Sequence, residues 1–231
     1  MKISVALAAY KGERYLGEQL DSVLPQLPPD GEVFVSDDCP GGATEALVRE
    51  YCRRDGRVHY LTGPGKGVCA NFENALRACT GDVIFLADQD DVWLPGKVEK
   101  VIAEMEKGAD VVLHDARVTD GALQVTEPSF FAVHGSRGGL LPNLIRNSFV
   151  GCCMAFRRDL LAFVLPFPQK LPMHDWLIAL AAYKKGKKVV LLPEALLDWR
   201  RHGDNVTGGA KNTFLCRLKW RLQMVYYLLK I

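Results

Sequence analysis

The chain has 231 residues, of which 48% are hydrophobic and 24% charged, and its net charge is only +2. This composition is ordinary for a globular protein of one large or two small domains, and the balanced charge points to no nucleic-acid partner. The seven cysteines are odd in number and have no paired CxxC spacing, which favours reduced thiols over a disulfide framework or a zinc site.

The first half of the chain alternates β-rich runs with stretches of helical spacing. We predict strands over residues 3–9, 33–36, 58–61 and 83–86, and helices over 15–24, from 44 onward, over 70–78 and over 98–105. Strands that alternate with helices of about ten residues predict βαβ units and a parallel sheet covered on both faces. The first strand begins almost at Met1, so we expect no signal peptide, and no apolar run reaches the roughly 18 residues of a membrane span.

The second half is less regular. We predict strands at 111–114 and 189–192, strand character over 147–156, and helices at 157–164 and 175–184. The polar segment from Asp115 to about residue 147 shows no clear period, which predicts a loop or lid. The tail over 213–231 mixes basic and apolar residues and predicts an amphipathic helix. Such a helix lies on an anionic membrane surface, packs in the core or forms a dimer contact.

The acidic run Asp88-Gln89-Asp90-Asp91 directly follows an apolar strand. Three carboxylates within four positions repel one another unless a positive group lies among them. A divalent cation with oxygen ligands, Mg²⁺ or Mn²⁺, is the usual remedy and commonly brings a phosphate with it. The alternative is a solvated turn whose aspartate caps the next helix, and it would be favoured for an isolated Asp-x-Asp.

Further polar residues are predicted at the carboxyl edge of the sheet, where ligands bind in such folds. Tyr10 ends the first strand and either stacks on a base or is a surface tyrosine. Asp37 and Asp38 end the second strand and either accept hydrogen bonds from a base or ribose or mark a turn. The glycine-rich run 63–67 precedes the helix that carries Asn71, and it matches neither the Walker loop nor the dinucleotide pattern.

Seven motifs occur together in one order. They are residues 3–12, Val35 to Asp38, Gly65 to Gly67 with Asn71-Phe72, Asp88 to Pro95, Asn147-Ser148 with 151–156, Met173 to Trp176, and residues 199–206. This order resembles family 2 glycosyltransferases, inverting enzymes of the GT-A fold, over residues 2–208. Within that family the chain is similar to the rhamnosyltransferase-like branch of O-antigen or capsule assembly. The resemblance implies a Rossmann-like, mostly parallel sheet flanked by helices, here followed by a C-terminal amphipathic helix.

The resemblance implies a donor and metal site in the first half. Asp90 would ligate Mn²⁺ or Mg²⁺ directly, Asp88 would face the ribose and the metal's water shell, and Asp91 would ligate as well or cap a helix. The metal would neutralise the diphosphate of the leaving nucleotide. The donor-binding positions would be Ala8, Tyr10, Asp37, Asp38, Lys66, Asn71, Asp88 and Gln89.

The second half would carry the base. Asp175 matches the carboxylate that deprotonates the acceptor hydroxyl as it attacks the anomeric carbon. His174 replaces the glutamate of the usual Glu-Asp pair, and it would orient Asp175, contact the acceptor, or be a hydrogen-bonded histidine at a helix start. Trp176 would be an acceptor-side sugar platform or a core residue.

The last motif supplies three further candidates. His202 would reach the metal or the diphosphate, whereas Arg200 and Arg201 would pair with phosphate oxygens or form a solvated basic turn.

We therefore expect an inverting, metal-dependent glycosyltransferase of hexosyltransferase type. It would move a sugar, with rhamnose favoured, from a dTDP- or UDP-sugar to a glycan or lipid-linked acceptor of bacterial cell-surface polysaccharide. The rivals are a sugar nucleotidyltransferase and a non-catalytic nucleotide- or glycan-binding domain. Residues 1–95 would form the donor half, 96–208 the acceptor and base half, and 209–231 the tail helix. The protein would be cytoplasmic, with the tail against the inner face of the plasma membrane or a second copy.

Overall fold

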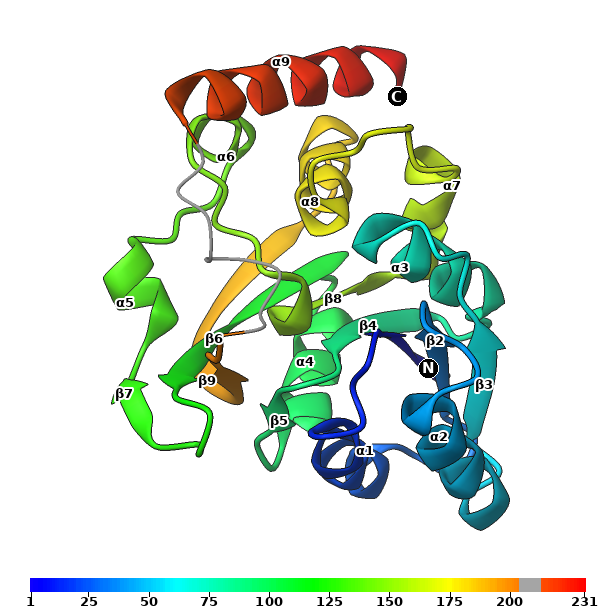
Figure 1. Ribbon diagram of the computed structural model, residues 1–231. Coiled ribbons are helices and arrows are strands. Elements are labelled where there is room, and N and C mark those ends of the chain that lie inside the picture. Colours follow the sequence, from blue (N-terminus) through cyan, green and yellow to red (C-terminus); the bar gives the residue numbers. More distant parts are fainter. Residues whose placement is uncertain (204–212) are drawn as a thin grey trace.

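A computed structural model describes residues 1–203 and 213–231. Its centre is a single sheet with the strand order β3-β2-β1-β4-β8-β6-β9-β5, and β7 pairs beside β6. Helices cover both faces of this sheet (Figure 1). The boundary expected near residue 208 lies outside the described residues, and so do residues 204–206 of the last motif.

The first four strands pair in parallel, as the alternating pattern predicts. They are β1 (Ile3–Ala9), β2 (Glu32–Asp37), β3 (Val58–Thr62) and β4 (Val83–Asp88). The crossovers contain α1 (Leu16–Val23) with the short turn η1 (Leu24–Gln26), α2 (Ala43–Arg54) and α3 (Val68–Ala78). Each predicted element of this half is present and begins within two residues of its predicted start. The predictions succeed because each strand or helix buries apolar residues that recur at the spacing typical of its type.

The second half of the sheet mixes strand directions, so a mostly parallel sheet describes only the first half. Strand β8 (Met154–Arg157) runs antiparallel to both β4 and β6 (Val111–Thr119). Strand β9 (Val189–Arg200) runs parallel to β6, and β5 (Val92–Trp93) runs antiparallel to β9. Helix α4 (Lys97–Glu106) connects β5 to β6. Strands β6 and β9 extend well past their apolar cores because they continue to pair with each other.

The prediction of a loop or lid without regular structure from Asp115 to about residue 147 is wrong. The segment contains β7 (Val125–Glu127), α5 (Phe130–His134) and α6 (Leu140–Ile145). These elements are too short to show a period, and tertiary hydrogen bonds fix them instead. The buried Asp115 carboxylate accepts a hydrogen bond from the backbone N–H of Phe131 at 2.8 Å and one from the Ser129 hydroxyl at 2.5 Å.

The strand predicted over 147–156 is confirmed only at its end. Residues before β8 form the turn η2 (Gly151–Cys153), and the helix predicted over 157–164 is divided into η3 (Arg158–Leu160) and α7 (Leu161–Val164). The predicted strand thus contains a turn, η2, which brings the backbone of Gly151 to the edge of the sheet. A continuous strand would not place it there.

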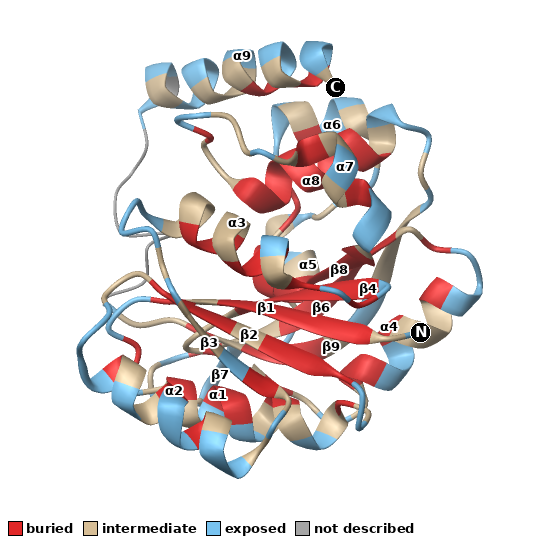
Figure 2. Cartoon of the chain, turned by 90° about the vertical axis from the view of Figure 1, so that its right-hand side faces the viewer, coloured by how far each residue is buried: buried red, intermediate tan, exposed pale blue. Residues whose placement is uncertain are grey.

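Two helices form successive outer layers on one side of the sheet (Figure 1). Helix α8 (His174–Lys184) contacts α6, α7, β9 and α9 (Phe214–Lys230). Its first nine residues are all buried (Figure 2), as expected for a helix that is covered all round. No helix within residues 1–203 or 213–231 combines the length and apolarity that a bilayer crossing needs.

A buried carboxylate holds the amino-terminal edge of the parallel strands together. Glu32 accepts hydrogen bonds from the Ser4 hydroxyl at 2.5 Å and the Thr80 backbone N–H at 2.7 Å, and the Lys2 ammonium lies 2.8 Å away. Burial acts to raise the pKa of Glu32, but these donors outweigh it and lower the pKa from 4.5 to about 2. Because the folded-state pKa is depressed, the carboxylate stabilises the fold above about pH 4.5, and this contribution is lost as the pH falls towards 2.

We predict that Glu32→Gln lowers the free energy of unfolding by about 2 kcal/mol at pH 7 and by about half that or less at pH 3. Urea denaturation of both proteins at the two pH values measures the difference. Glu50→Gln, at a side chain that is 56% exposed, is the matched control and should change stability by less than about 0.5 kcal/mol. A loss for Glu32→Gln that is equal at both pH values would contradict the assignment.

Candidate active site

A cavity of about 390 Å³ opens at the carboxyl-terminal edge of β1 and β4. Its walls come from the end of β1, the acidic loop after β4, the glycine-rich turn before α3, η2 and the start of α8. Of the predicted site residues, those that line it are Ala8, Tyr10, Asp38, Asn71, Asp88, Gln89, Asp90, His174 and Asp175. The fold therefore brings the predicted donor motifs and the predicted base to one cavity.

Only one of the two aspartates at the end of β2 faces this cavity. Asp38 accepts hydrogen bonds from the backbone N–H groups of Gly65 and Gly67, each at 2.8 Å, and so fixes the glycine-rich turn. Asp37 is fully buried behind it, where it accepts a hydrogen bond from Cys39 N at 3.0 Å, and burial raises its pKa. The sequence did not show which of the two aspartates faces the cavity, because neighbouring residues at a strand end point to opposite faces of the sheet and both residues are equally polar.

The side chain of Gln89 joins the ends of β1 and β4. Its Oε1 accepts a hydrogen bond from Tyr10 N at 2.8 Å, and its Nε2 donates to Tyr10 O at 3.1 Å. A Cβ at Gly12 would lie 2.2 Å from Gln89 Oε1, so glycine leaves the room that this contact needs. Gln89 thus positions Tyr10, whose ring stays 56% exposed at the rim of the cavity.

The two predicted donor residues around α3 lie in different environments. Asn71 lies on α3, and its amide donates to the carbonyls of Ala9 at 3.0 Å and Ser36 at 2.9 Å. Its Oδ1 is buried and has no hydrogen-bond partner among the described residues. Lys66 is exposed and does not line the cavity. Asn71 therefore ties the first two strands together, and its buried Oδ1 lies against Gly63, where a Cβ would come within 2.7 Å of it.

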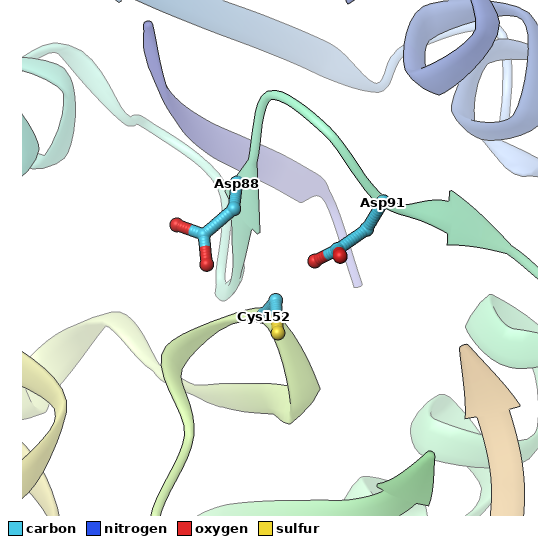
Figure 3. Close-up of side chains that lie close together, drawn as sticks. All are labelled: Asp88, Asp91 and Cys152. Carbon is cyan, nitrogen blue, oxygen red and sulfur yellow. The ribbon is translucent and has the colours of Figure 1, made fainter. Parts of the chain in front are cut away.

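Two aspartates of the acidic loop converge on a cysteine. One ligand atom each of Asp88, Asp91 and Cys152 lies within 4.8 Å of the others, and Figure 3 shows both carboxylates turned toward η2. Burial raises the pKa of Asp91 to about 7, and the charge of Asp90 adds to this. Burial and the neighbouring carboxylates likewise raise the pKa of Asp88 well above its usual range. The fold thus holds carboxylates of like charge close together, and a nearby positive group must offset the free-energy cost of their repulsion.

Lys97, at the first position of α4, supplies a buried positive charge beneath the loop. It is 1% exposed, its Nζ donates to the Cys152 carbonyl at 2.8 Å, and it lies 4.1 Å from the centre of the Trp93 ring. Burial lowers its pKa to about 8, while the charges of Asp91 and Asp88 act to raise it. Sequence reasoning missed Lys97, although a lysine at the start of a predicted helix, only six residues after Asp91, was a usable signal.

Arg200 fixes the backbone of the acidic loop from the end of β9. It is 3% exposed, its backbone N–H donates to Asp91 Oδ1 at 3.0 Å, and its guanidinium donates to the Asp90 carbonyl at 2.8 Å. The guanidinium also pairs with Glu18 and donates to the Gly121 carbonyl at 3.0 Å. These partners are all groups of the protein itself, so Arg200 fixes the acidic loop in place and is not part of a solvated basic turn.

His202 and Arg201 lie close to the cavity wall. His202 Nε2 is 2.8 Å from Asp90 Oδ2, and its ring lies 4.9 Å from that of Tyr15. The Arg201 guanidinium lies 4.6 Å from the ring centre of Trp199, which lines the cavity and which sequence reasoning did not single out. His202 therefore contacts the acidic loop directly, whereas its predicted contact with a metal or a diphosphate stays a prediction.

The residues present fit a divalent cation on the cavity side of the loop better than in the buried trio. Asp88 and Asp90 line the cavity, and the imidazole of His202 touches the Asp90 carboxylate, which makes an oxygen and nitrogen donor set. In the trio, Lys97 already supplies a positive charge, and a hydrogen bond with Cys153 together with burial raises the pKa of the Cys152 thiol well above its usual range. A thiol must lose its proton to bind a metal, so this raised pKa disfavours the trio as the metal site.

Asp175 begins α8 and reaches the cavity from the opposite side. It is 3% exposed, and its Oδ1 accepts a hydrogen bond from Trp176 N at 2.6 Å. Burial raises its pKa from 3.8 to about 7, although backbone groups of Trp176 and Gly151 lower it in part. The charge of Asp175 also raises the pKa of Asp88, so the two carboxylates share one electrostatic environment.

The neighbours of Asp175 differ from two of the predicted alternatives. His174 is not a hydrogen-bonded histidine, because neither ring nitrogen has a partner among the described residues; its ring stacks on Phe72 at 4.0 Å. Burial lowers its pKa to about 3, so it is neutral. Trp176 is 6% exposed, and its indole N–H donates to the Asn143 carbonyl at 2.8 Å. The structure places Trp176 in the core, away from the cavity wall.

Comparisons with known proteins agree on one family and fold. Residues 4–165 match the family model described as Glycosyl transferase family 2. TuaG of Bacillus subtilis, a putative teichuronic acid biosynthesis glycosyltransferase, is 24% identical over 211 residues, which cover 89% of this chain and 81% of TuaG.

Two solved structures show the same fold. Residues 1–349 of S. aureus TarS in complex with UDP-GlcNAc superpose with a TM-score of 0.74 at 21% identity, covering 97% of this chain and 66% of that 349-residue fragment. The mannosyltransferase PcManGT from Pyrobaculum calidifontis, in complex with GDP-Man and Mn²⁺, gives a TM-score of 0.67 at 18% identity, covering 99% of this chain and 64% of PcManGT. The chain spans only 66% of the length of a curated relative from Nostoc and 60% of one from Mycobacterium bovis.

We predict that Lys97→Met lowers the free energy of unfolding by about 3 kcal/mol, because it leaves the carboxylates and the Cys152 carbonyl without their buried cation. Urea denaturation in EDTA measures this without bound metal. Adding Asp91→Asn should recover at least about 1 kcal/mol, since it removes one of the charges that Lys97 offsets. Lys100→Met, on the same helix and 46% exposed, is the control and should cost less than about 1 kcal/mol. Additive losses in the double variant would contradict the coupling.

Proposed function

Because the chain belongs to glycosyl transferase family 2, we propose that it transfers a sugar from a nucleotide-sugar donor to a glycan or lipid-linked acceptor in cell-surface polysaccharide assembly. The observation that carries the proposal is the cavity on which Asp38, the acidic loop and the buried Asp175 all converge. Related proteins give the donor and pathway class their support, because TarS binds UDP-GlcNAc, PcManGT binds GDP-Man, and TuaG is described as a teichuronic acid enzyme.

The donor nucleoside would lie against the ends of β1 and β2. Tyr10 offers an exposed ring at the rim for stacking on a base, and Gln89 holds its backbone in place. Asp38 keeps the turn of Gly65 and Gly67 close to the cavity, and the missing side chains there let a ribose approach the backbone. Asn71 lines the cavity beside this turn and would contribute to the wall against which the nucleoside lies.

The acidic loop would hold the diphosphate end of the donor. Mn²⁺ or Mg²⁺, bound by Asp88, Asp90 and His202, would supply positive charge that stabilises the nucleoside diphosphate as leaving group. Arg200 holds Asp91 and the Asp90 backbone in place, and Lys97 holds the Cys152 carbonyl beneath them, so the loop would need little rearrangement when the donor binds. Asp91 is turned inward, and its role is to anchor the loop to Arg200 and η2.

Asp175 would act as the base of a single displacement, which inverts the anomeric centre. Its pKa of about 7 means that a large fraction is ionised at neutral pH and still basic enough to take a proton from the acceptor hydroxyl. The neutral, unpartnered ring of His174 lies in the same wall and shapes the approach of the acceptor. The backbone at Gly151 keeps this wall open, since a Cβ there would lie 3.2 Å from His174 Nε2.

The sugar that we propose is rhamnose, carried as dTDP-rhamnose. Its support is the similarity to the rhamnosyltransferase-like branch, including the histidine at position 174 before the predicted base. Since relatives of the same fold bind UDP-GlcNAc and GDP-Man, the donor screen must include dTDP-, UDP- and GDP-sugars. The release of nucleoside diphosphate identifies sugar transfer, whereas release of pyrophosphate would identify a nucleotidyltransferase instead.

We predict that Asp175→Asn lowers the transfer rate by about 10² to 10⁴-fold while preserving donor binding. The wild-type rate should rise as the pH increases through about 7, because the base acts in its ionised form. The raised pKa also means that ionised Asp175 disfavours the fold, so its contribution to stability falls as the pH rises from about 4 to about 7 and stays low above that. At pH 8, the free energy of unfolding of Asp175→Asn should therefore exceed that of the wild type by about 1 to 3 kcal/mol. Full activity in this variant would exclude Asp175 as the base.

We predict that Asp90→Ala abolishes metal-stimulated release of nucleoside diphosphate, with a loss of at least about 100-fold. Isothermal titration with Mn²⁺ and nucleotide should show weakened joint binding, and circular dichroism should show an unchanged fold. Asp30→Asn, an exposed aspartate far from the cavity, removes the same charge and should leave both measurements unchanged. Nucleotide binding without turnover of any donor would favour the non-catalytic alternative.

A further inference from the structure

The helix α9 has an apolar inner face and a second apolar face on the opposite side. Met224 and Leu228 of the inner face are buried at 0% and 5% exposure. The outer face consists of residues that are 41 to 76% exposed, namely Leu215, Leu218, Leu222, Val225, Tyr226 and Leu229. These positions recur every three or four residues, which places them on one side of the helix. A helix that only packed on the body of the protein would need the inner face alone.

A neighbouring helix also exposes apolar side chains. Leu141 and Ile145 of α6 are 71% and 68% exposed, and α6 contacts α9. The Arg221 guanidinium donates to the Ile145 carbonyl at 2.9 Å, which fixes the end of α6 against α9. Figure 1 shows α9 as the outermost layer of the molecule, with α6 beneath its first turns. Exposed apolar side chains on adjoining helices mark an interaction surface and not isolated surface residues.

Basic residues flank this outer face on both sides. At 100° per residue, Lys219 and Lys230 lie along one border of the face, and Arg221, which also donates to the Ile145 carbonyl, lies along the other. Arg217 falls on the opposite side of the helix, at an angle between Met224 and Leu228. No acidic residue occurs between positions 213 and 231. A second copy of α9 set against the outer face would bring these like charges together with no carboxylate of α9 to offset them.

We propose that the outer face of α9 docks on an anionic membrane surface. An apolar stripe bordered by lysine and arginine matches an interface in which hydrocarbon lies beneath a layer of phosphate headgroups. The aliphatic stems of the flanking residues can follow the stripe inward while their charges stay among the headgroups. The helix then lies flat on the surface, in agreement with its exposure along its whole length.

This placement connects the surface to the cavity through one helix. The inner face of α9 packs on α8, and Lys184 of α8 donates to the Leu228 carbonyl at 2.5 Å. The first turn of α8 carries Asp175. Docking would hold the cavity at a fixed height above the membrane, where a lipid-linked acceptor presents its sugar. This consequence rests on the proposed function, whereas the docking itself does not.

The test is flotation of the full 231-residue chain with vesicles of 30% phosphatidylglycerol in phosphatidylcholine, compared with pure phosphatidylcholine. We expect binding to the anionic vesicles and at least tenfold less to the neutral ones. Leu218→Glu with Leu222→Glu should reduce binding at least tenfold, since both side chains leave the apolar layer. Lys219→Gln with Lys230→Gln should reduce it by about 25-fold, from about fivefold for each charge.

Two control variants separate the possible causes of a loss. Val125→Glu places the same charge at an apolar side chain that is 48% exposed on β7, away from α9, and should leave binding unchanged. Asp175→Asn should also bind normally, so that failed docking and failed catalysis remain distinguishable. Vesicle binding that survives both α9 double variants would overturn the proposal. So would absence of binding together with a dimer, seen by light scattering, that the Leu218 and Leu222 changes dissociate.

Discussion

The whole site depends on keeping three carboxylates together at the end of β4. Asp88, Asp90 and Asp91 repel one another, and burial of two of them adds to the cost of their charges. The protein offsets this with one buried cation and with hydrogen bonds from a later element of the chain. Lys97 lies beneath the loop at the start of α4, and Arg200 holds its backbone from the end of β9. The short pairing of β5 with β9 brings Arg200 to that position.

This constraint explains why the sheet changes direction after β4. The parallel half alone would leave the acidic loop exposed on one side. Strand β8 runs antiparallel beside β4, and the turn η2 before it places Cys152 and Gly151 against the loop. Strands β6 and β9 then extend together towards the same edge and deliver Trp199 to the cavity wall. The second half of the sheet is thus the support of a site whose charged residues mostly belong to the first half.

Three carboxylates at this edge of the sheet disfavour the fold in their ionised form. Asp88, Asp91 and Asp175 all have raised pKa values because they are held away from water. The opposite edge of the sheet shows the contrast, since Glu32 has enough donors around it for its pKa to fall to about 2. A carboxylate with satisfied partners stabilises the fold, whereas one kept short of partners remains available to a ligand or a proton. Helix α8 links this reactive edge to the outer layer that α9 forms.

The sequence alone determined the parts that depend on local periodicity. The strands and helices up to Met105, the long helices after Met173 and the sheet edge at which the polar residues gather all follow from apolar spacing and from the rule that parallel strands end together. It also singled out Asp88 and Asp90 from the acidic run and Asp175 from the resemblance to a family, and the structure brings the three to one cavity. What it could not decide were contacts between distant residues. That Asp38 and not Asp37 faces the cavity, that Trp176 is a core residue, and that Arg200 straps the loop depend on which groups the fold brings within hydrogen-bond range. The same holds for Lys97, a single lysine without a motif, whose role exists only because α4 and η2 enclose it beside three carboxylates that lie together at the end of one strand.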